Sequence, residues 1–180
     1  MEELETGVEQ VQEGVHHEAL HSGVPKWFTM SAVLSAIFAV LAAVSSLFSG
    51  HHANEAMIDQ MKAADQWAFF QAKSIKATIV DGNVTLHKEL GKNPDPKLIE
   101  KAARYREEQK EVEKDAKEKE EASHQHFEIH SVLAKGVTFF QIAIGIVAIA
   151  VLARKRKFLY LAGLFATAGA FFLTKGLFFP

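Results

Sequence analysis

The chain has 180 residues and a formal net charge of −2, with 20 basic and 22 acidic residues. It contains no cysteine, which excludes disulfides and thiolate metal sites. Acidic residues dilute the basic ones everywhere except at Arg154–Lys157, so the composition gives no reason to expect a nucleic-acid partner. Apolar and charged residues are instead strongly segregated along the chain, which is typical of a membrane protein.

Residues 1–25 form an acidic N-terminal tail that carries six Glu and no Lys or Arg. A secretory signal needs a basic start, so we interpret the apolar run that follows as an uncleaved anchor. Disorder is expected in the tail. The alternative is a coiled-coil contact between subunits, because one helical stripe is apolar: Leu4, Val8, Val11, Val15 and Ala19.

Three apolar runs predict transmembrane helices at residues 26–49, 132–153 and 158–179. Each is about 20 residues long, which matches a hydrocarbon core of about 30 Å. Lys135 and Lys175 lie near span ends, where their long side chains can reach the headgroups. Three buried helices of a soluble bundle are the alternative, but soluble helices rarely lack a polar face for so long. The predicted fold is therefore an all-α integral membrane protein.

Orientation follows from the basic link at residues 154–157, because short basic loops stay cytoplasmic. This places the N-terminus in the cytoplasm and residues 50–131 in the periplasm, across a bacterial inner membrane. Residues 50–131 also contain many lysines, which argues against this orientation, but acidic residues match them and the segment is longer than the loops that the rule governs.

Residues 50–131 predict a long helical hairpin outside the membrane, with arms at about 50–80 and 96–131. The first arm is expected to end at Asp81–Asn83, since Gly82 adopts the left-handed cap conformation easily. Asp95 and Pro96 predict the N-cap and first residue of the second arm. The apolar stripe of the first arm consists of Met57, Met61, Ala64, Ala68, Ile75 and Ile79.

The second arm has a narrow, coiled-coil-like seam with alternating steps of four and three residues. The seam residues are Leu98, Ala102, Tyr105, Gln109, Val112 and Ala116. Around them, "EEQKEVEKDAKEKEE" contains many opposite charges four residues apart, which support a water-exposed helix face. The seam buries little apolar area, so we expect the hairpin to gain stability from other subunits or from a partner.

Two groups of residues are candidates for contact with neighbours. Trp67, Phe69 and Phe70 cannot all face one narrow seam, so part of this aromatic surface is predicted to meet another subunit or another membrane protein complex. In the first span, the small residues Ser31, Ser35 and Ala39 allow close helix packing. That packing is within one chain or between subunits, and serines lining a pore are a further alternative.

The stretch "DQWAFFQAKSIK", Asp65–Lys76, resembles the tryptophan–alanine–aromatic–aromatic–glutamine–alanine–lysine signature of a bacterial membrane-protein family catalogued as a domain of unknown function. "FQIAIGIVAIAVL", Phe140–Leu152, is similar to that family too. The resemblance implies three spans with a long helical insert. It brings no known activity and no catalytic residues.

Histidines flank the predicted spans on the hairpin side. His126 and His130 are four residues apart, as are His51 and Glu55, so each pair shares a helix face. An antiparallel hairpin would bring both pairs to the same height, which is a candidate site for zinc, copper or nickel. The alternatives are interfacial histidines without a metal and histidines that sense pH. No other cofactor is predicted.

The sequence contains no Ser-His-Asp order, phosphate-binding glycine loop or HExxH pattern, and its spans hold almost no ionisable groups. We therefore expect neither an enzyme nor a coupled transporter. The predicted function is an oligomeric membrane protein with a structural, scaffold or assembly role through its hairpin. The alternatives are an oligomeric channel or pore and a metal- or pH-responsive membrane sensor.

Overall fold

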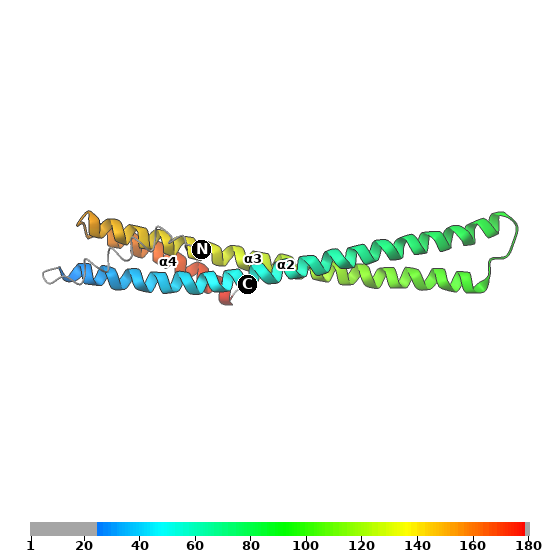
Figure 1. Ribbon diagram of the computed structural model, residues 1–180, viewed down its shortest axis with the longest axis horizontal. Coiled ribbons are helices and arrows are strands. Elements are labelled where there is room, and N and C mark those ends of the chain that lie inside the picture. The colour runs from blue at the N-terminus through cyan, green and yellow to red at the C-terminus, as the bar shows by residue number, and fades with distance from the viewer. Residues whose placement is uncertain (1–24, 179–180) are drawn as a thin grey trace, which may run out of the picture. The chain divides into compact units, whose positions relative to one another are not determined.

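The computed structural model describes residues 25–178, and every regular element in that range is a helix (Figure 1). The helices are α2 (Lys26–Glu89), α3 (Pro96–Leu152) and α4 (Lys157–Phe178). All three are long and apolar enough to cross a membrane. The prediction of an all-α fold with three helices of spanning length is confirmed. The acidic tail, with its apolar stripe, lies outside the described residues.

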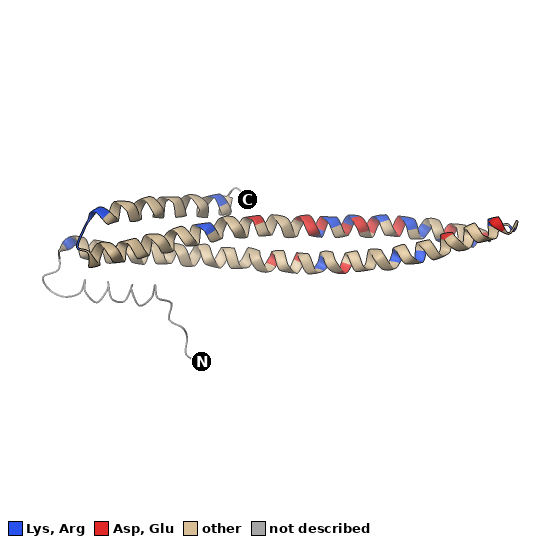
Figure 2. Cartoon of the chain, turned by 90° about the horizontal axis from the view of Figure 1, so that it is seen from above, with Lys and Arg blue, Asp and Glu red and all other residues tan. Residues whose placement is uncertain are grey.

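The chain divides into two compact units, which we name by their composition. The apolar unit comprises the described residues of Met1–Ala53 and Phe127–Pro180, and the charged unit is Asn54–His126. Figure 2 shows Lys, Arg, Asp and Glu gathered on the charged unit and on the link between α3 and α4. Helices α2 and α3 each contribute residues to both units, whereas α4 belongs to the apolar unit alone.

Parts of all three helices pack together in the apolar unit. One buried cluster joins Phe38 of α2 to Val147 of α3 and Ala162 of α4. A second joins Ala42, Leu133, Phe140 and Leu173. Glycines make room for the larger side chains, since a Cβ at Gly169 or Gly176 would lie within about 3 Å of Phe140 or Leu133. Such close approach is the usual way in which helices associate in lipid, where van der Waals packing replaces the hydrophobic effect.

In the charged unit, the segments of α2 and α3 run antiparallel and in contact. Asp81 forms an ion pair with Arg106, at 2.8 Å, and Lys73 pairs with Glu108. The Ser123 hydroxyl donates a 2.8 Å hydrogen bond to the Ala56 carbonyl. Residue numbers therefore fall along α2 as they rise along α3, as two antiparallel helices require.

Three of the six residues predicted to form the seam on α3 are buried, and the other three are half-buried. Ala102, Val112 and Ala116 are buried, with Ala116 wholly inaccessible to solvent. The apolar stripe noted on α2 does not pack on α3, because all six of its residues are exposed: Met57, Met61, Ala64, Ala68, Ile75 and Ile79. The Met and Ile side chains of this stripe therefore lie on the outside of the charged unit.

The face of α2 that packs on α3 is made of small residues: Ala56, Ala63, Ala77 and Val80 are each buried to 93% or more. Alanines let two helix backbones approach more closely than methionine and isoleucine would. The cross-helix contacts of Lys73 and Asp81 then hold α2 in this rotation about its axis. This segment of α2 therefore has two apolar faces, and the face made of the smaller residues is the buried one.

The predicted end of the first arm at Asp81–Asn83 is also wrong, since α2 continues through Gly82 to Glu89. The helix ends instead around Gly91, which has φ of 68°. There the Lys92 amide donates to the His87 carbonyl at 2.9 Å and the Gly91 amide donates to the Lys88 carbonyl at 3.0 Å. These two bonds define a Schellman cap, which satisfies the last carbonyls of the helix.

The predicted start of the second arm is confirmed. Helix α3 begins at Pro96, and the Lys97 amide donates a 2.9 Å hydrogen bond to the Asp95 carboxylate. Proline suits the first helical position because it lacks an amide hydrogen that the helix would leave unpaired. Asp95 therefore caps α3.

We expect Gly82→Ala and Gly91→Ala to have opposite effects on stability. Gly82 lies inside α2 with open space around it, so alanine should stabilise the helix by about 1 kcal/mol. Gly91 has positive φ, where alanine costs about 1–2 kcal/mol. Thermal unfolding followed by circular dichroism measures both. A loss of stability in Gly82→Ala would show that α2 stops at Gly82 after all.

Candidate functional site

The segment Trp67–Lys73 holds the aromatic residues for which we predicted contacts with neighbours. Trp67 and Phe70 are half-buried and meet edge to face, with ring centroids 5.4 Å apart. Phe69 is 49% exposed on the outside of α2. Two of the three rings therefore contribute to packing within the charged unit, and Phe69 is the ring most available to another molecule.

Lys73, the last residue of the same segment, connects α2 to α3. Its ammonium group pairs with Glu108 and lies 5.9 Å from the ring centroid of Tyr105 and 5.1 Å from that of Phe69. The hydrogen bond that Lys73 donates holds the pKa of the Glu108 carboxyl below its ordinary value of 4.5. Our sequence reasoning did not single out Lys73. Its spacing of four residues from Phe69 was the available signal.

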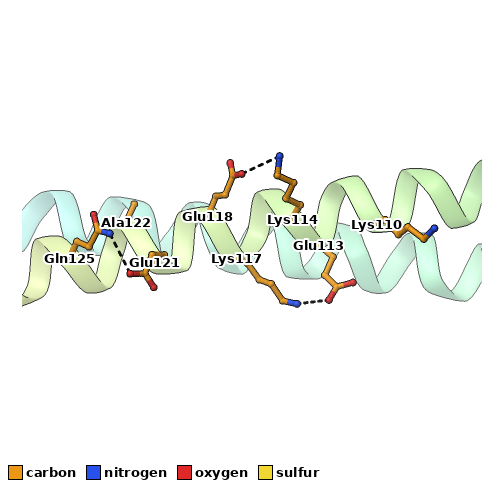
Figure 3. A pocket seen from close by; sticks show the side chains of 8 residues that line it. All are labelled: Lys110, Glu113, Lys114, Lys117, Glu118, Glu121, Ala122 and Gln125. Carbon is orange, nitrogen blue, oxygen red and sulfur yellow. Dashed lines mark hydrogen bonds and ion pairs between the residues drawn. The ribbon is translucent and has the colours of Figure 1, made fainter.

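The outward face of α3 in the charged unit carries a series of ion pairs between residues of the same helix (Figure 3). Lys117 pairs with Glu113 at 2.7 Å and Lys114 with Glu118 at 3.5 Å, each four residues apart on the helix. These side chains are 39–77% exposed. Pairs of this kind contribute about 0.2–0.5 kcal/mol each, so they support a solvated helix rather than a binding site.

His130 is held by a serine on the facing helix of the apolar unit. Its Nδ1 lies 2.9 Å from both the hydroxyl and the carbonyl oxygen of Ser49. The Ser49 hydroxyl also lies 3.2 Å from the His130 carbonyl oxygen. The contact ties the start of the apolar part of α3 to α2, and it occupies one of the two ring nitrogens.

We had predicted a metal site from His51, Glu55, His126 and His130. His51 and His130 belong to the apolar unit, and Glu55 and His126 belong to the charged unit. Within residues 25–178, no group of three or more His, Asp or Glu side chains is arranged to hold a metal ion. Metal binding by these four residues stays a prediction.

The small residues singled out in the first span pack within the chain. Ser31 is wholly buried and donates a 2.7 Å hydrogen bond to the Trp27 carbonyl, and Ser35 is 2% exposed. Ala39 is half-buried beside the cluster around Phe38. Ser31 and Ser35 therefore present no surface to a second copy in this structure.

The basic link lies at the same end of the apolar unit as the start of α2, because the guanidinium of Arg156 stands 5.6 Å from the ring centroid of Trp27. Residues 154–157 are all exposed. Arg154 takes the left-handed conformation, with φ of 51°, and ends α3 with the same type of cap as Gly91. Positive charge is thus concentrated where an interfacial aromatic residue also lies.

Taken together, an all-helical chain with three helices of spanning length is typical of the class of integral membrane proteins. The family model "Domain of unknown function (DUF4337)" matches residues 27–179, and the chain belongs to that family. The resemblance to an uncharacterised family is thereby confirmed. No curated protein and no solved structure matches the chain.

Proposed function

We propose that the protein is an oligomeric membrane protein with a structural or assembly role. In this proposal, Asn54–His126 forms a helical hairpin outside the membrane and contacts neighbouring subunits. In this proposal the protein has no catalytic role, and it acts through the surfaces by which its subunits pack together.

The observation that supports the proposal is the exposure of large apolar side chains in the charged unit. Met57, Met61, Phe69, Ile75 and Ile79 are 49–61% exposed in a unit whose other surface is dense in charge. Covering apolar surface contributes about 25 cal/mol per Å². A neighbouring subunit that covers these side chains would therefore add substantially to the stability of both copies.

The proposed location is the bacterial cytoplasmic membrane, with the N-terminus in the cytoplasm and the hairpin in the periplasm. Lys26 and the basic link support this orientation, because the positive-inside rule places such clusters in the cytoplasm. A reporter enzyme that is active only in the periplasm, inserted at Gly91, should be active. Activity of a cytoplasmic reporter at the same position would invert the orientation.

The oligomer is tested by mass photometry of the full chain in a mild detergent. We expect a particle that contains two or more copies of the 19.9 kDa chain. Phe69→Ser should shift the particles towards the monomer, since it removes an exposed ring from the charged unit. Phe171→Ser is the matched control, because Phe171 is 62% exposed but belongs to the apolar unit. A monomeric wild-type protein would contradict the proposal.

A further inference from the structure

Within the charged unit, α2 is apolar on two opposite faces. One face packs on α3 through Ala63 and Ala77. The other contains Met61, Ile75 and Ile79, which are 56–61% exposed. A helix that paired with α3 alone would need only the first face. Packing on α3 therefore does not explain why the second face is apolar.

The residues of the exposed face follow one another along α2 at alternating steps of three and four residues. Its nine positions are all exposed, and we name them the α2 stripe: Ile58, Met61, Asp65, Ala68, Ala72, Ile75, Ile79, Gly82 and Leu86. This is the heptad spacing of the positions that meet in a coiled coil. A mean step of 3.5 residues keeps one face of a helix against a partner helix over many turns.

We propose that the α2 stripe pairs with the α2 stripe of a second copy, in parallel and in register. The inference rests on the proposed function and specifies which surface the subunits share. Copies inserted in one membrane have the same orientation, so their α2 helices leave it in the same direction. That common direction makes the parallel pairing the one available to two copies.

The exposed apolar area is sufficient for such an interface. Met57, Phe69 and Leu90 flank the stripe and are 49–63% exposed. Together with the stripe, they offer on the order of 800 Å² per copy, which is about what each partner buries in a stable interface. The area therefore agrees with a second copy as the occupant.

Other segments of the same chain do not fit the stripe. The outward face of α3 carries ion pairs such as Lys117–Glu113, and burying it against apolar side chains would desolvate these charges. The acidic tail precedes the first span and the stripe follows it. A single membrane crossing puts these two segments on opposite sides of the bilayer.

Asp65 is the one charged residue of the α2 stripe. A charged residue in a coiled-coil seam lowers the stability of the pair. In-register pairing places the two Asp65 side chains at the same height, where their charges repel. Asp65→Leu should therefore strengthen self-association, and Ile75→Glu should weaken it at least about tenfold because it puts a charge into the seam.

Disulfide cross-linking tests the geometry directly, because the chain has no cysteine of its own. Ala68→Cys and Ile75→Cys, each in the full chain in native membranes, should form covalent dimers on oxidation. Lys114→Cys is the control, since the Lys114 side chain is 77% exposed on α3, outside the stripe. Helical circular dichroism should be unchanged in Ile75→Glu, because Ile75 is 61% exposed and does not belong to the buried face of α2.

The outcomes separate this inference from the proposed function. Oligomers that cross-link through Lys114→Cys but not through Ala68→Cys or Ile75→Cys would overturn the stripe and leave the proposed function standing. Monomers would overturn both. Cross-links from Ala68→Cys and Ile75→Cys to a different protein alone would also overturn pairing with a second copy.

Discussion

Phe140→Ala is expected to lower the free energy of unfolding of the apolar unit by about 3 kcal/mol. Phe140 is wholly buried, belongs to the cluster with Leu133 and Leu173, and lies against Gly169 of α4. Removing the ring leaves a cavity between α3 and α4 that these neighbours cannot fill. The expected loss is in packing, because the separated helices would still lie in apolar surroundings. Unfolding in mixed micelles with increasing dodecyl sulfate measures it.

Phe171→Ala is the matched control for this prediction. Phe171 is on α4 and is 62% exposed, so most of its surface lies outside the packed interior of the unit. We expect its removal to change the unfolding free energy by less than about 0.5 kcal/mol, as is usual for surface substitutions. Equal losses in the two variants would mean that Phe140 is not a packing residue of the three-helix core.

Gly176→Ala is expected to destabilise the apolar unit by about 1–3 kcal/mol through overpacking. A Cβ at this position would lie 2.6 Å from Cδ2 and 2.7 Å from Cγ of Leu133. Leu133 is wholly buried, so its side chain has no open space to move into. The helices must then separate or Leu133 must adopt an unfavourable rotamer, and the same dodecyl sulfate titration detects either result.

Gly163→Ala provides the comparison on the same helix, since nothing lies within 4 Å of a Cβ at Gly163. We expect it to be neutral or slightly stabilising, because alanine is the better helix former. A wild-type-like Gly176→Ala would show that α4 does not approach α3 as closely as this structure has it.

The contact between His130 and Ser49 shows how much of the candidate site could be predicted from the sequence. Helical spacing predicted a shared helix face for His126 and His130, but the partner that the structure gives His130 is Ser49, eighty-one residues away. Likewise, the sequence drew attention to the aromatic residues around Trp67, whereas the contacts of Lys73 depend on where Glu108 and Tyr105 lie on α3. Contacts of this kind depend on the rotation of each helix, which spacing within one helix does not determine.

Elements whose physical causes are local could be predicted from the sequence alone. Apolar length alone specified three helices able to span a membrane, and Asp95 with Pro96 specified the start of α3. Which face of α2 packs on α3 depends on contacts between the helices, because both faces of α2 are apolar in that segment. The sequence also did not show that α2 continues past Gly82. The helix tolerates this glycine and ends only at the cap around Gly91. Alanines line the buried face because they let the backbones approach closely, and the Met and Ile side chains of the stripe lie outside.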